Sequence, residues 1–101
     1  MKVNPVLQLL TIAVSVLLVA CGTPEERADA YLEEARSQYE DGDLVKAKLS
    51  VRNCLQLEPR NSRARYLYAQ ILEVEQDVRG VLANLQVAID EDPDYLDARV
   101  K

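Results

Sequence analysis

Residues 28–61 read ADAYLEEARSQYEDGDLVKAKLSVRNCLQLEPRN, and residues 62–95 read SRARYLYAQILEVEQDVRGVLANLQVAIDEDPDY. The second stretch repeats the first. When the two copies are aligned, identical residues include Ala30 and Ala64, Ala35 and Ala69, Asp43 and Asp77, and Pro59 and Pro93. A constant repeat period of about 34 residues indicates that one structural unit is used twice.

Each copy divides into two expected helices. Thr23-Pro24-Glu25-Glu26 predicts the first helix start, with an N-cap, a proline at the first helical position and a capping-box glutamate. Asp41-Gly42-Asp43 ends that helix, and the second helix covers about 44–57, before Pro59. Asn61 or Ser62 is expected to cap the third helix and Asp77 the fourth. Asp92-Pro93 closes the fourth, and residues 94–98 open a fifth.

Apolar residues recur every three or four positions along each expected helix, which predicts one buried face per helix. The expected core residues are Ala28, Tyr31, Leu32, Ala35 and Tyr39 in the first helix, Leu44, Ala47, Val51, Cys54 and Leu55 in the second, Ala64, Leu67, Tyr68, Ile71 and Leu72 in the third, and Val78, Val81, Leu82, Leu85, Ala88 and Ile89 in the fourth.

Two helices in each period resemble the tetratricopeptide repeat (TPR). Tyr31 stands where that family favours Trp, Ala35 where the paired helices approach closely, and Gly42 in the turn. The departures from the family pattern are Gln38, Arg65, Leu72 and Gln76. The resemblance implies an all-α fold with TPR repeats at 28–61 and 62–95 that form a short right-handed α-solenoid. A helical bundle without the TPR arrangement is the alternative.

A repeat of this kind buries its apolar face only against a neighbour, and roughly three repeats are needed for stability. Residues 96–101 begin a third repeat. We therefore expect the chain to be the N-terminal part of a longer array, or a domain that a partner completes. A complete small protein is the alternative.

Residues 1–20 form an apolar leader that precedes the repeats. Lys2 is its single charged side chain, and the apolar run from Val6 to Ala20 is shorter than the ~20 residues of a membrane span. Leu18-Val19-Ala20-Cys21 resembles the lipobox of bacterial lipoproteins, which implies a cleaved signal peptide and a lipidated Cys21 followed by a linker over 21–27. Gly22 after the cysteine implies the outer membrane of a Gram-negative host, with the protein facing the periplasm. The alternatives are an ordinary cleaved signal and an uncleaved anchor.

Composition argues against several classes of function. The chain has no His, which removes the commonest general base and the usual metal ligand. The acidic cluster at 90–94 lacks the spacing of a calcium-binding loop, and Cys54 is expected to be a small buried side chain. We therefore expect no enzyme activity, metal, cofactor or small-molecule substrate. A net charge of −5 with no basic tract argues against binding to nucleic acid or to anionic lipid.

The TPR resemblance implies a concave groove, lined by the first helix of each repeat, that binds a protein or peptide. The residues at groove-facing positions are Asp29, Leu32, Arg36, Tyr39 and Glu40, then Arg63, Tyr66, Gln70, Glu73 and Val74. Among them Arg36, Tyr39, Arg63, Tyr66 and Gln70 are the candidate partner-binding residues, because Arg and Tyr predominate at binding hot spots. Leu32, Arg36 and Leu67 stand where TPR chaperone adaptors carry a carboxylate clamp, so the sequence predicts no such clamp.

The lipidated cysteine and the repeats together resemble the TPR lipoproteins of exosortase and exopolysaccharide export, and less specifically the pilotin lipoproteins of type IV pili. The resemblance implies a membrane-anchored scaffold for envelope assembly or export. The repeat region of a larger periplasmic enzyme and a purely structural envelope lipoprotein are the alternatives.

Overall fold

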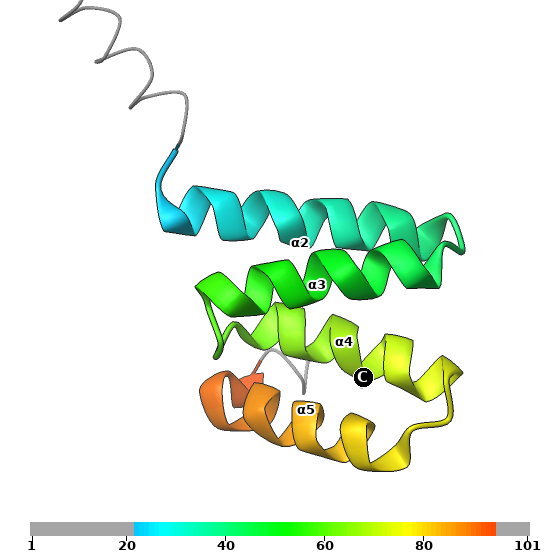
Figure 1. Ribbon diagram of the computed structural model, residues 1–101. Coiled ribbons are helices and arrows are strands. Elements are labelled where there is room, and N and C mark those ends of the chain that lie inside the picture. Colours follow the sequence, from blue (N-terminus) through cyan, green and yellow to red (C-terminus); the bar gives the residue numbers. More distant parts are fainter. Residues whose placement is uncertain (1–21, 95–101) are drawn as a thin grey trace, which may run out of the picture.

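The computed structural model describes residues 22–94, which form four α-helices (Figure 1). They are α2 (Pro24–Glu40), α3 (Leu44–Leu57), α4 (Ser62–Val74) and α5 (Val78–Glu91). This part of the chain contains no strand, so the predicted all-α class is confirmed for it. None of its helices is both long and apolar enough to span a bilayer. The leader, Cys21 and most of the expected fifth helix lie outside the described residues.

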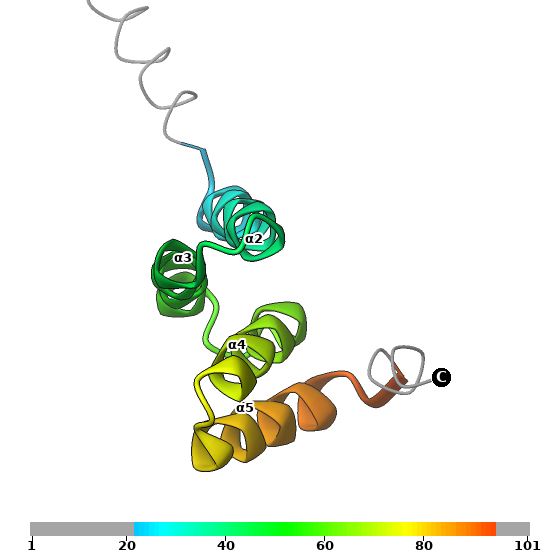
Figure 2. The same ribbon diagram turned by 90° about the vertical axis from the view of Figure 1, so that its right-hand side faces the viewer.

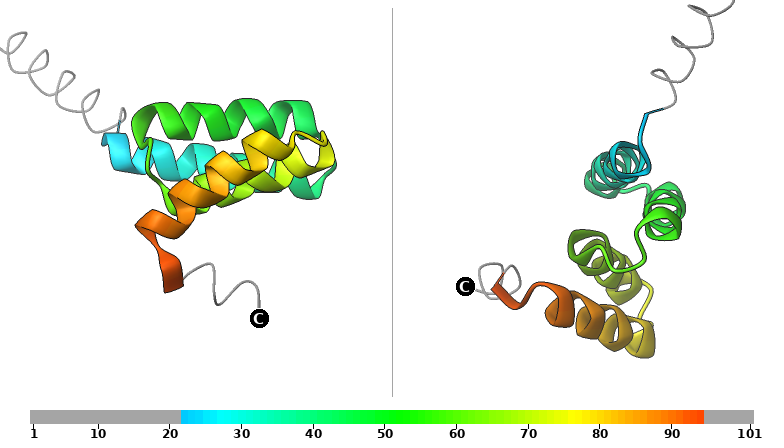
Figure 3. Two further views of the ribbon diagram at one scale, coloured as in Figure 1. Left: turned by 90° about the horizontal axis from the view of Figure 1, so that it is seen from below. Right: turned by 90° about the vertical axis from the view of Figure 1, so that its left-hand side faces the viewer.

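Successive helices run in opposite directions and pack against their neighbours in the chain (Figure 1). Seen end-on, α3 is displaced to one side of α2 and α4, and these two helices also touch each other (Figure 2). The axis of α5 is inclined to those of α2 and α3 (Figure 3). The arrangement leaves one face of α2 and one face of α4 side by side, although α3 separates them in sequence.

The helix starts are confirmed residue by residue. The Thr23 side chain accepts a hydrogen bond from the Glu26 amide, and the Glu26 carboxylate accepts one from the Thr23 amide, which completes the predicted capping box. Asp43, Asn61 and Asp77 cap the next three helices through their side-chain oxygens. Short polar side chains satisfy amides that the first turn leaves without a partner, which explains why these starts can be read from sequence.

The turns after α2 and α4 have the same backbone conformation at equivalent positions of the two copies. Gly42 has a φ of 83° and Gln76 a φ of 63°, both in the left-handed region. The amide that follows each of these residues donates to a carbonyl near the end of the preceding helix, from Asp43 to Gln38 and from Asp77 to Leu72. This is the pattern of a helix end with a left-handed residue. The second copy thus has the same turn with a glutamine in place of the glycine, although glycine adopts a positive φ at lower steric cost.

The core lies between α2, α3 and α4. The buried residues of this cluster, all of them predicted, are Ala28, Leu32, Ala35, Ala47, Val51, Cys54, Ala64, Leu67 and Ile71. Tyr31, Tyr39, Leu55 and Tyr68 are partly buried against it. Burial raises the pKa of the Cys54 thiol to about 11, and the nearby Glu58 carboxylate adds to the shift. The predicted core faces of the first three helices are therefore confirmed, except that Leu44 is only half-buried and lies outside this cluster.

The predicted core face of the fourth helix is wrong in part. Ala88 is buried, but Val78, Leu82 and Ile89 are 67%, 62% and 45% exposed. α4, the first helix of the second copy, packs on α3 of the first copy. It contributes Ala64, Leu67 and Ile71 to the cluster that buries Val51. Among residues 22–94 no further helix packs on α5 as α4 packs on α3, so the outer side chains of α5 are exposed to water.

A polar contact joins the two helices of each copy, through equivalent residues on the second helix but different positions on the first. Ser50 and Asn84 are both buried, and each occupies the same place in its copy of the repeat. The Ser50 hydroxyl donates to Gln38 Oε1 at 2.7 Å, and Asn84 Oδ1 accepts from Arg65 Nη1 at 2.9 Å. Gln38 and Arg65 are two of the departures from the TPR pattern, and each forms a hydrogen bond that joins the two helices of its copy.

Candidate functional site

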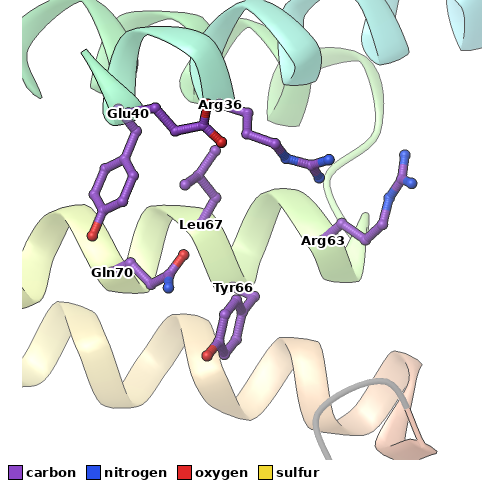
Figure 4. Close-up of a pocket in the computed structure, with 7 residues that line it drawn as sticks. Arg36, Glu40, Arg63, Tyr66, Leu67 and Gln70 are labelled. Atoms are coloured by element: carbon purple, nitrogen blue, oxygen red, sulfur yellow. The ribbon is translucent and has the colours of Figure 1, made fainter. Parts of the chain in front are cut away.

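An open groove of about 430 Å³ lies between α2 and α4 (Figure 4). We call it the α2–α4 groove, and its lining residues are Arg36, Tyr39, Glu40, Arg63, Tyr66, Leu67 and Gln70. The five residues singled out from the sequence all belong to this set. Two of the five come from α2 and three from α4, and they meet because these two helices are side by side (Figure 2).

Two arginines lie toward one end of the α2–α4 groove, and each has only a loose partner. Arg36 Nη1 lies 3.5 Å from Glu33 Oε1 on the same helix, and Arg63 Nη2 lies 3.9 Å from Asp29 Oδ1 across the two helices. Both arginine side chains are more than a third exposed. Exposed pairs of this kind contribute only ~0–1 kcal/mol, so a bound anion can replace their carboxylates at little cost.

Three other polar groups of the α2–α4 groove have no partner within residues 22–94. They are the Tyr39 hydroxyl, the Glu40 carboxylate and the Gln70 amide, none of which makes a side-chain hydrogen bond or ion pair with another described residue. Leu67 is 6% exposed and supplies an apolar floor. The groove therefore offers two cations, an anion, neutral donors and acceptors, and a small apolar surface to a ligand.

The remaining groove predictions are mixed. Leu32 is fully buried in the core, so its assignment to the groove is wrong, and its apolar side chain explains why. Asp29 reaches the groove only as the partner of Arg63. Val74 is exposed but does not line the groove, and Glu73 lines a neighbouring hollow. The sequence predicts Leu67 only as a core residue, although it also forms the groove floor.

That neighbouring hollow, of about 250 Å³, lies between α4 and α5. We call it the α4–α5 hollow, and it is lined by Tyr66, Ala69, Gln70, Glu73, Val81, Leu85 and Ile89. The equivalent residues of the first copy include Leu32, Ala35, Ala47 and Val51, which are fully buried. In the first copy the surface equivalent to the α4–α5 hollow is covered by α4, whereas in the second copy it is open.

A further hollow, of about 480 Å³, lies on α3 and the turn after α4. This α3 hollow shares no residue with the α2–α4 groove and is lined by Val45, Lys46, Lys48, Leu49, Arg52 and Glu75. Lys48 Nζ lies 2.8 Å from Glu75 Oε2, and this hydrogen bond raises the pKa of Lys48 above its usual value. Val45 and Leu49 are exposed, and the helical pattern marks neither of them as a core residue.

Metal binding and thiol chemistry would depend, among residues 22–94, on the metal-ligating side chains and on the Cys54 thiol. Among residues 22–94 no three His, Cys, Asp or Glu side chains are grouped so that they could hold a metal ion. Cys54 is buried, and its raised pKa keeps the thiol protonated at neutral pH. No protein-family model matches the chain, and no curated protein matches it significantly.

Proposed function

We propose that this protein is a TPR scaffold that binds a segment of a partner protein in the α2–α4 groove. Two helix pairs stack in the right-handed sense of a short α-solenoid. The scaffold holds a partner and catalyses no reaction.

The TPR assignment is supported by features that recur at equivalent positions of the two copies. Asp43 and Asp77 cap the second helix of each pair. Gly42 and Gln76 take the same left-handed backbone conformation in the turns. An accidental helical bundle has no reason to repeat its caps and turns at one fixed spacing.

The observation that carries the groove proposal is the meeting of Arg36, Tyr39, Arg63, Tyr66 and Gln70 around one open hollow. These residues come from two helices that are not consecutive in the chain. Arginine and tyrosine provide large contact areas and directional hydrogen bonds at protein interfaces. A volume of about 430 Å³ is also in the ~300–1,000 Å³ range of ligand sites, which suits a few residues of peptide.

A lipid anchor at Cys21 completes the proposal. Only Gly22 and Thr23 separate Cys21 from the start of α2 at Pro24, so the repeats would stand directly at the membrane surface. The Leu18-Val19-Ala20-Cys21 stretch supports acylation, and Gly22 supports the outer membrane. The anchored scaffold would serve envelope assembly, in exopolysaccharide export or, as the second candidate system, in pilus assembly.

Site-specific photocrosslinking in cells tests the groove directly. A benzophenone amino acid is placed at Tyr66 or at Gln70, and in a matched control at Leu49 of the α3 hollow, which is 60% exposed. We expect one partner protein to crosslink at the two groove positions and not at position 49, and Arg63→Ala to reduce the yield. Equal crosslinking from position 49, or none from the groove, would contradict the proposal.

A further inference from the structure

We infer that the α2–α4 groove selects a peptide segment carrying an acidic and a basic side chain two or three residues apart. This inference rests on the proposed function and adds the chemistry of the partner. It follows from the uneven distribution of charge along the groove.

One pole of the α2–α4 groove is cationic. Arg36 from α2 and Arg63 from α4 extend toward the same end of the groove, away from Gln70 (Figure 4). Their carboxylate neighbours lie at 3.5 and 3.9 Å, beyond good hydrogen-bond distance. Two guanidinium groups without close partners fit one carboxylate, which can accept bidentate hydrogen bonds from an arginine.

The other pole is an acceptor site. Glu40 follows Arg36 by four residues on α2, and Gln70 follows Arg63 by seven residues on α4. Neither Glu40 nor Gln70 has a partner within residues 22–94. A ligand ammonium or guanidinium group would satisfy the Glu40 carboxylate, with the Gln70 amide oxygen as a second acceptor.

The separation of the poles sets the spacing of the ligand's charges. At about 1.5 Å per residue, four to seven helical residues correspond to about 6–10 Å along the helix axes. A β-extended chain advances about 3.3 Å per residue and turns side chains two residues apart to one face, which covers about 7 Å. A polyproline II segment advances about 3.1 Å per residue and turns side chains three residues apart to one face, which covers about 9 Å. Leu67 forms the floor between the poles, which favours a small apolar residue in the middle of the segment.

Blocked hexapeptides provide the probes. The dipolar peptide Gly-Glu-Ala-Ala-Lys-Gly is compared with versions that carry two Glu, two Lys or two Ala at the charged positions. Binding to the ¹⁵N-labelled protein is followed by NMR titration at low salt, where exposed charges are least screened. We expect the dipolar peptide to shift the groove resonances and to bind about threefold to tenfold tighter than any of the other three.

Glu40→Lys provides a gain-of-preference test that a folding defect cannot imitate. Glu40 is exposed, and the substitution makes both poles cationic, so the variant should prefer the doubly acidic peptide over the dipolar one. Glu34→Lys on the same helix is the matched control, since it makes the same change in net charge outside the groove and should keep the wild-type preference.

A wild-type preference for the doubly acidic peptide, equal shifts for all four peptides, or no shift with any of them would overturn the inference. So would an unchanged preference in Glu40→Lys, or the same change of preference in Glu34→Lys. The photocrosslinking experiment separates this failure from that of the proposed function. If positions 66 and 70 crosslink a partner but the peptides are not discriminated, only the inference is wrong.

Discussion

The left-handed conformation at Gln76 predicts that Gln76→Gly stabilises the protein. Its φ of 63° is unusual for a residue with a side chain and costs ~1–2 kcal/mol. Glycine removes that cost but loses more backbone entropy on folding, which lowers the gain in stability by ~0.5–1 kcal/mol. The net expectation is an increase of about 0.5–1 kcal/mol in the free energy of unfolding. For a domain of this size that raises Tm by about 2–8 °C.

Gly42→Gln is the matched reverse substitution, because Gly42 occupies the equivalent turn with a φ of 83°. A Cβ added at Gly42 meets no atom within 4 Å, so only the backbone conformation opposes the new side chain. We expect a loss of about 0.5–1 kcal/mol. Thermal unfolding followed by circular dichroism and urea unfolding measure both variants. Destabilisation by Gln76→Gly would refute the reasoning, since it would mean that the second turn does not share the conformation of the first.

Three further predictions concern the anchor, the core and the buried thiol. Cys21→Ala should abolish labelling by an alkyne fatty acid and release the protein from the membrane fraction; retained labelling would contradict lipidation. Leu32→Ala, at a fully buried position, should cost about 2–5 kcal/mol in urea unfolding, whereas Leu82→Gln, at a position 62% exposed, should change stability by less than about 0.5 kcal/mol. A larger loss at Leu82 would mean that the outer face of α5 is covered. The Cys54 thiol has a pKa of about 11 in the folded protein against 9.0 for an unperturbed thiol. Stability should therefore be insensitive to this group below pH 9 and fall between pH 9 and about 11, where only the unfolded thiol ionises, and Cys54→Ala should lack that component of the pH dependence.

Local chemistry explains which parts of the fold could be predicted. Thr23, Asp77 and either Asn61 or Ser62 are expected from sequence to cap helices, and Thr23, Asn61 and Asp77 do so through a hydrogen bond from an amide in the first turn of the helix. Asp43, which the sequence pattern places only in the turn, caps α3 in the same way. Such contacts join residues only three positions apart in the chain, so they can be predicted from the local sequence. The groove residues were predictable for a related reason, because a fixed repeat brings the same face of α2 and α4 together.

The errors have a non-local cause. Periodicity marks Leu82 and Ile89 as apolar positions but does not say whether another element covers them. Ser50 and Asn84 lie on the inward faces of α3 and α5, and a search for apolar residues passes over buried polar ones such as these. A polar residue at an inward position of the helical period, with a polar residue on the facing helix, is the signal that would have found them.

The most direct test of the scaffold account is the affinity of the crosslinked partner segment for paired variants. Isothermal titration compares wild type, the groove variant Arg36→Ala/Gln70→Ala, and the control variant Leu49→Ala/Arg52→Ala in the α3 hollow, with circular dichroism to verify equal helicity. The account predicts a loss of about tenfold or more in the groove variant and no change in the control. Unchanged affinity in the groove variant, or an equal loss in the control, would contradict it.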